Sequence, residues 1–211
     1  MTIPVLAIHI LFAIGLFCVS VVATYLVLRL GILDEPNHRS SHDGPTPSTG
    51  GIAIVFTFAI GFTIVWIVSD QARLSTIHLS GFAASALGIA MVGFLDDLKL
   101  LRTFKIKLGV QIAASFVLLA FGIVFTKMSL PLIGAFDLGW LGYPLTIFWV
   151  VALTNMFNFM DGLNGLAGGT AVTVAVFLCA VTFLEGSFFV FIFSYIMAAG
   201  AAGFLVFNFP R

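Results

Sequence analysis

Three polar residues stand three apart in an otherwise apolar stretch, at Asn155, Asn158 and Asp161. Residues three apart on a helix lie on neighbouring turns of one side, so two carboxamides and a carboxylate would face the same way. Polar groups at bilayer depth are costly and commonly functional. Oxygen ligands without His or Cys favour Mg²⁺ or Mn²⁺ over zinc. A glycine-rich segment, residues 162–169, follows at once and would let a ligand approach the backbone closely.

A pair of adjacent carboxylates, Asp96 and Asp97, precedes Lys99 at the end of another apolar run. Neighbouring residues of a helix point about 100° apart, so the two carboxylates are not expected to be equivalent ligands of one ion. One would bind a hard cation or act as a base, and the other would take a different role, such as orienting a lysine. The alternative is a solvated pair, but acidic groups at the carboxyl end of a helix oppose its dipole.

Basic residues accompany these acids. Four of them follow the acidic pair: Lys99, Arg102, Lys105 and Lys107. One interpretation is that they determine the membrane topology and attract anionic headgroups. The other is that they bind the phosphate of a lipid or of a nucleotide sugar, and both can hold together. The polar loop of residues 34–51 adds Arg39 and His42, which could neutralise a phosphate. An ordinary polar loop is the alternative interpretation.

The composition indicates the fold class. Of 211 residues, 61% are hydrophobic and 9% are charged, and the mean hydropathy is +1.18. These values indicate an all-α, polytopic integral membrane protein with a single transmembrane domain over residues 1–211. Neither a disulfide framework nor a cysteine metal site is expected, because Cys18 and Cys179 both lie in apolar runs. About seven runs are long enough to span a bilayer: residues 4–30, 50–69, 77–95, 108–126, 143–158, 168–184 and 187–207.

The distribution of positive charge predicts an orientation. If each predicted helix crosses the membrane once, seven of the nine Lys and Arg lie on the same side of it: Arg29, Arg39, Lys99, Arg102, Lys105, Lys107 and Arg211. The positive-inside rule makes this side cytoplasmic, with the N-terminus outside and the C-terminus inside. Trp66, Trp140 and Tyr143 would form an aromatic belt at the opposite interface. Every polar cluster of interest then lies at the cytoplasmic face.

At these residues the chain resembles the polyprenyl-phosphate N-acetylhexosamine-1-phosphate transferases, glycosyltransferase family 4. Three motifs match in order: the loop of residues 34–51 with its Arg-Ser-Ser-His and Pro-Thr-Pro, the acidic pair before a lysine, and Asn-x-x-Asn-x-x-Asp-Gly. Any one motif is weak, and the three together are strong. The residues of these motifs are most similar to those of the O-antigen-initiating branch, whose donors are often UDP-linked 6-deoxy-HexNAc sugars.

The resemblance implies a reaction in the bacterial inner membrane, at a site facing the cytoplasm. An undecaprenyl phosphate oxygen attacks the β-phosphate of a UDP-HexNAc, UMP leaves, and the lipid-linked sugar initiates a cell-surface polysaccharide. The implied cofactor is Mg²⁺, with Mn²⁺ as an alternative. Asp96 and Asp97 would be catalytic, one of them deprotonating or positioning the lipid phosphate, and Asn158 and Asp97 would hold the metal. The implied substrate-binding residues are Arg39, His42, Lys99, Asp161 and Asn164.

The sequence departs from the family pattern in three places. Many members have Asp where this chain has Asn164, and Ser48 and Thr49 stand where the O-antigen branch often has Arg-Gly. The chain also stops at Arg211, where the family continues with a loop that carries a metal-binding Asp, further helices and a His-rich loop. The match covers about two-thirds of a family member. We therefore expect a C-terminally truncated chain with little or no transferase activity by itself.

Two other functions compete with the enzyme. One is a truncated, non-catalytic membrane remnant that binds polyprenyl phosphate or a partner subunit. The other is a transporter or channel that uses the aspartates along a pathway, which predicts charges spread through the membrane depth; here they cluster at one face. The expected partners are undecaprenyl phosphate, a UDP-HexNAc and the lipid bilayer, with no nucleic acid and with a homodimer left open.

Overall fold

The computed structural model describes residues 3–30, 33–34, 46–47, 50–68, 75–101, 103–161 and 163–209. Within them, helices dominate. The α-helices are α1 (Ile3–Arg29), α2 (Gly51–Val68), α3 (Thr76–Asp97), α4 (Phe104–Ala120), α5 (Gly142–Met160), α6 (Leu166–Leu184) and α7 (Phe188–Asn208). The other elements are the strands β1 (Leu33–Asp34), β2 (Thr46–Pro47), β3 (Lys127–Leu130) and β4 (Gly134–Asp137), and the short 3-10 helix η1 (Gly139–Leu141).

The expected all-α membrane architecture is confirmed. Among the described residues, six helices are long and apolar enough to cross a membrane. Most predicted helix ends lie within two residues of the observed ones, because the apolar runs end where the helices end.

Helix α4 is the exception. It has 17 residues and is not one of the six candidate spans in the described part of the chain. It begins before the predicted run of residues 108–126 and ends at Ala120, since Gly122 turns the backbone with φ 80°. The apolar residues that follow lead into an antiparallel hairpin of β3 and β4, in a region that we expected to be a loop.

The described residues cluster into two compact units, and the expectation of a single transmembrane domain stays a prediction. Unit 1 comprises Met1–Arg73 and Met160–Arg211, and unit 2 comprises Leu74–Phe159. Each unit is described by itself below.

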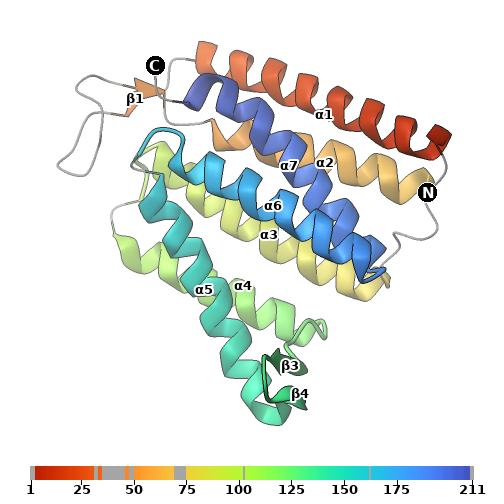
Figure 1. The fold of residues 1–211 in the computed structure, drawn as a ribbon. Helices are drawn as coiled ribbons and strands as arrows, with labels where there is room; N and C mark the ends of the chain where they lie inside the picture. The colour runs from red at the N-terminus through yellow and green to blue at the C-terminus, as the bar shows by residue number, and fades with distance from the viewer. Residues whose placement is uncertain are drawn as a thin grey trace. The chain divides into compact units, whose positions relative to one another are not determined.

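Unit 1 is organised around α7, which packs against α1, α2 and α6 (Figure 1). The close approach depends on small residues, as is common between membrane helices. The hydroxyl of Ser20 on α1 donates to the carbonyl oxygen of Gly200 on α7 at 2.6 Å. A Cβ on Gly203 would lie 2.6 Å from Cβ of Ser20, so glycine is required where the two helices meet. In the same unit, β1 pairs antiparallel with β2.

Unit 2 contains α3, α4, the β3–β4 hairpin, η1 and α5 (Figure 1). Helices α3 and α4 form an antiparallel pair, in which the buried hydroxyl of Ser85 donates to the carbonyl oxygen of Ala114 at 2.9 Å. Beyond the end of α4, the N–H of Phe125 donates to the hydroxyl of Thr146 on α5 at 3.0 Å. This bond ties the start of α5 to the end of α4, so the two helices run in opposite directions.

Candidate functional site

The acidic pair lies at a tight helix end. Helix α3 ends at Asp97, and the N–H of Lys99 donates to the carbonyl oxygen of Asp96 at 2.8 Å. The N–H of Leu100 donates to the carbonyl oxygen of Leu95 at 3.0 Å, which completes a Schellman motif. Lys99 occupies the left-handed position of this motif, with φ 57°, where glycine is usual. A lysine held in strained backbone is an indication of function.

The structure separates the two aspartates. The carboxylate of Asp96 forms an ion pair with Nζ of Lys107 on α4, at 2.5 Å, and both side chains are partly exposed. Asp97 is the next residue along α3 and therefore points about 100° away from Asp96. The sequence predicted unequal roles, one of them orienting a lysine. In the structure, Asp96 is the aspartate that pairs with a lysine, Lys107.

A second polar contact joins α4 to α5. The side-chain amide of Asn155 donates to Oε1 of Gln111 at 2.7 Å and to the carbonyl oxygen of Val151 at 2.8 Å. Gln111 is 4% exposed, and it was not among the predicted site residues. Its signal in the sequence is a carboxamide inside an apolar run. Asn155 is therefore engaged within the protein, whereas Asn158, one turn later, is exposed.

These contacts share one side of α4. Lys107 and Gln111 are four residues apart, so their side chains are neighbours on the helix surface. Because α4 and α5 are antiparallel, Asn158 lies one turn further from Asn155 toward the Lys107 end of α4. The ends of α3 and α5 and the start of α4 are thus at the same end of unit 2 (Figure 1).

The remaining predicted residues of the third motif belong to unit 1. Asp161 and Asn164 are exposed in the turn between α5 and α6. Gly165 caps the start of α6 with φ 77°, and its N–H donates to Oδ1 of Asn208 at the end of α7, at 2.9 Å. The side chain of Asn208 thereby fixes the turn that carries Asp161 and Asn164. Arg39 and His42 lie outside the described residues.

The donors in unit 2 fit a magnesium ion in type. In the part of the chain that the structure describes, no group of three or more His, Cys, Asp or Glu could hold a metal ion. Asp97 and Asn158 would supply a carboxylate and a carboxamide oxygen. Mg²⁺ commonly takes one or two carboxylates and completes its shell with substrate phosphates and water. The residues present therefore suit a metal that is bound together with a phosphorylated substrate.

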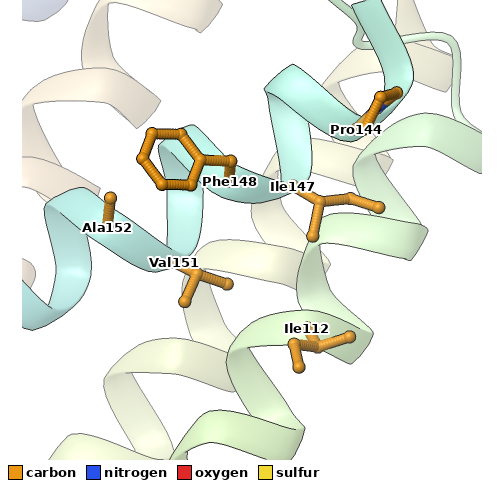
Figure 2. A pocket seen from close by; sticks show the side chains of 6 residues that line it. All are labelled: Ile112, Pro144, Ile147, Phe148, Val151 and Ala152. Atoms are coloured by element: carbon orange, nitrogen blue, oxygen red, sulfur yellow. The ribbon is translucent and has the colours of Figure 1, made fainter. Parts of the chain in front are cut away.

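An apolar groove runs along the first half of α5 and reaches the level of the contact between Asn155 and Gln111. It has a volume of about 340 Å³ and is lined by one residue of α4 and five of α5. Figure 2 shows these residues: Ile112, Pro144, Ile147, Phe148, Val151 and Ala152. Ile112 is next to Gln111 in the chain, and the carbonyl oxygen of Val151 accepts a hydrogen bond from Asn155. The groove and the polar contact therefore share the same helix turns.

Comparison with known proteins gives a family match. Residues 78–211 match the family model of glycosyl transferase family 4, which covers more than half of the chain. The matched region includes α3, α4 and α5, and hence the acidic pair, Lys107, Gln111 and Asn158.

Curated relatives agree with this match. The chain is 31% identical over 185 residues to a protein of Bacillus subtilis (strain 168) named "Probable undecaprenyl-phosphate N-acetylglucosaminyl 1-phosphate transferase", covering 87% of this chain and 50% of that one. It is 29% identical to the undecaprenyl-phosphate alpha-N-acetylglucosaminyl 1-phosphate transferase of Escherichia coli (strain K12), over 85% and 47% of the two chains. A phospho-N-acetylmuramoyl-pentapeptide-transferase of Synechococcus sp. is 32% identical, over 79% and 49%. The chain thus spans about half the length of these relatives, less than the two-thirds implied by the motifs.

Proposed function

Because this chain belongs to glycosyl transferase family 4, we propose that the whole protein transfers a HexNAc-1-phosphate from a UDP-sugar to undecaprenyl phosphate. An oxygen of the acceptor phosphate forms a bond to the β-phosphorus of the donor. The bond from that phosphorus to the bridging oxygen breaks, and UMP leaves with the bridging oxygen. The names of the relatives support the acceptor and the type of group transferred.

The observation that carries the proposal is an apolar groove that leads along α5 toward its polar end. A polyprenyl phosphate has a long apolar chain and a charged head, so its binding site must offer both environments side by side. The prenyl chain would follow the groove between α4 and α5. Its phosphate would then lie beyond Asn155, at the level of Lys107 and Asn158.

The resemblance and the contacts support the following roles for the site residues. Asp96 orients Lys107, and this lysine pairs with the acceptor phosphate. Asp97 and Asn158 would hold Mg²⁺, with Mn²⁺ as the alternative. When bound, the metal would polarise the diphosphate and stabilise the departing phosphate.

We assign binding of the UDP-sugar donor to Lys99, to residues in and after the Asn-x-x-Asn-x-x-Asp-Gly motif, and to the polar loop of residues 34–51. Asp161 and Asn164 contact the uridine side of the UDP-sugar, and Lys99, Arg39 and His42 contact its phosphates. The protein would act in the bacterial inner membrane with this end facing the cytoplasm, where basic residues accumulate. The product would initiate a cell-surface polysaccharide, and the residues of the three motifs favour O-antigen as this polysaccharide.

A transfer assay tests the proposal and separates it from the non-catalytic alternative. The whole protein is purified and supplied with Mg²⁺, undecaprenyl phosphate and, in separate reactions, radiolabelled UDP-GlcNAc or UDP-MurNAc-pentapeptide. Label in the lipid phase with UMP release would establish transfer and identify the sugar class. Metal-dependent binding of undecaprenyl phosphate without UMP release would favour the binding remnant. Neither binding nor release would contradict both functions.

A further inference from the structure

The β3–β4 hairpin is amphipathic. Side chains alternate between the two faces of a strand, so the register assigns each residue to a face. Met128 is opposite Phe136, and Leu130 is opposite Gly134 on the same face. The other face carries Lys127 opposite Asp137, with 3.9 Å between Nζ and Oδ1, and Ser129 opposite Ala135. One face is therefore apolar and the other is polar and charged.

The tip of the hairpin is also apolar. Leu132 is fully exposed, at 107%, and Ile133 is 72% exposed. Leu132 also has φ 74°, in the left-handed region where glycine or asparagine is favoured in turns. If this turn faced water, leucine at this position would contribute nothing to its stability. The sequence therefore presents two large apolar side chains at the tip, one of them against the preference of the backbone.

The hairpin is attached rigidly to the first turn of a membrane-crossing helix. Trp140 in η1, 75% exposed, and Tyr143 in α5 lie between the hairpin and the rest of the candidate span Gly139–Met160. The N–H of Leu138 donates to the carbonyl oxygen of Thr126 at 2.9 Å, which closes the base of the hairpin. A Cβ on Gly142 would overlap the carbonyl oxygen of Phe125, so the backbones pack closely there.

These observations favour the lipid bilayer as the partner of the hairpin. We propose that the β3–β4 hairpin is an interfacial membrane anchor, whose apolar face and Leu132–Ile133 tip insert into the headgroup–acyl boundary of the phospholipid bilayer. The hairpin leads directly into η1 and α5, where the exposed Trp140 and Tyr143 are of the residue types that mark a membrane interface. Four residues per strand extend roughly 13 Å, so the hairpin stays within reach of the headgroup layer. The Lys127–Asp137 pair then faces the headgroups and water, as on amphipathic interfacial helices.

Depth-dependent quenching tests the anchor. Cys18 and Cys179 are replaced by Ala, and an environment-sensitive fluorophore is attached to Leu132→Cys, Ser129→Cys or Phe148→Cys in the full chain. The proteins are reconstituted in phosphatidylcholine–phosphatidylglycerol vesicles, some with lipids that carry quenchers at shallow or deep acyl positions. Phe148, exposed in the middle of α5, is the reference for a position within the bilayer.

The expected result is strong quenching of the Leu132 probe by the shallow-quencher lipid and several-fold weaker quenching of the Ser129 probe. Equal quenching of both probes, or quenching of the Leu132 probe by aqueous iodide alone, would overturn the anchor. A Leu132 probe shielded from both lipid and iodide would also overturn it, because a protein surface would then cover the tip. Trp140 gives a label-free check in a Trp66→Phe/Trp149→Phe background, with the same shallow quenching expected. None of these readouts depends on the proposed transferase function.

Discussion

The side-chain amide of Asn155 donates one hydrogen to Gln111 on the neighbouring helix, at 2.7 Å, and the other to the carbonyl oxygen of Val151, at 2.8 Å. Both of its donor positions are thus occupied within the protein. Asn155 therefore docks α5 on α4, while Asn158, on the next turn, is exposed. A motif of three similar polar residues thus divides into one residue that joins two helices and two that are exposed.

A double-mutant cycle tests this docking contact. Gln111→Leu and Asn155→Leu should each destabilise the protein, and the double variant should be less destabilised than the sum of the two. The coupling free energy should be about 0.6 kcal/mol and at most ~1.7 kcal/mol, as for hydrogen bonds between membrane helices. Unfolding in mixed micelles measures it. Strictly additive effects would show that the contact contributes nothing.

Replacing Lys107 should separate binding from stability. Its ion pair with Asp96 is partly exposed, so Lys107→Met should change the free energy of unfolding by less than about 1 kcal/mol. A charge-assisted bond to the acceptor phosphate contributes more, so affinity for undecaprenyl phosphate should fall about tenfold. Lys107→Arg should retain most of the binding. Lys127→Met, which breaks the exposed pair with Asp137, is the matched control, and an equal loss of affinity there would refute the assignment.

Lys99 should show opposite effects on stability and binding. Lys99→Gly removes the steric cost of the left-handed backbone and should stabilise the protein by about 1 kcal/mol. The same change removes a positive charge beside Asp96 and Asp97 and should weaken binding of a UDP-sugar. Leu132→Gly relieves the same backbone strain in the β3–β4 hairpin and should leave UDP-sugar binding unchanged. Isothermal titration with UDP-GlcNAc, beside thermal unfolding, measures both quantities. Unaltered nucleotide-sugar affinity in Lys99→Gly would exclude Lys99 from the site.

Glycine at position 203 should be essential to unit 1. Gly203→Ala places a methyl group 2.6 Å from Cβ of Ser20, and overpacking of this kind costs about 1–3 kcal/mol. Gly169→Ala, on α6, meets nothing within 4 Å and should be neutral or stabilising. The two single-methyl variants are compared by their unfolding midpoints in one detergent. Similar midpoints would show that α1 and α7 do not approach as closely as described.

The cap on α6 should depend on Asn208. Asn208→Ala removes the acceptor for the N–H of Gly165 and should destabilise the protein by about 1 kcal/mol. Asn208→Asp keeps the acceptor and places a negative charge at a helix N-terminus, so it should be tolerated. Hydrogen exchange of the Gly165 amide reports the bond directly, since protection should be lost in Asn208→Ala only. Equal protection in all three proteins would contradict the cap.

The sequence predicted the helices better than the contacts. Apolar runs define most helix ends, because a span ends where polar residues begin. The end of α4 was missed, since Ile123, Val124 and Phe125 extend the apolar run beyond the turn at Gly122. The hairpin was missed because its strands have four residues each and Leu132 occupies the left-handed turn position where glycine is usual.

The polar contacts depend on residues far apart in the chain. Gln111 and Asn155 are 44 residues apart, so no local pattern joins them. In the same way, the choice between Asp96 and Asp97 required the position of Lys107 on a different helix. The chemistry of the motifs could be predicted from residue types, whereas the division of roles needed the packing of α3, α4 and α5.

Binding of undecaprenyl phosphate to the purified 211-residue chain can be measured in lipid nanodiscs by native mass spectrometry, with and without Mg²⁺. We expect saturable binding that strengthens with Mg²⁺, exceeds that of phosphatidylglycerol, and loses its metal dependence in Asp97→Asn. Asp137→Asn, on the hairpin, should behave as the unaltered chain does. Binding that is indifferent to Mg²⁺, unchanged by Asp97→Asn and no stronger than that of phosphatidylglycerol would contradict this expectation.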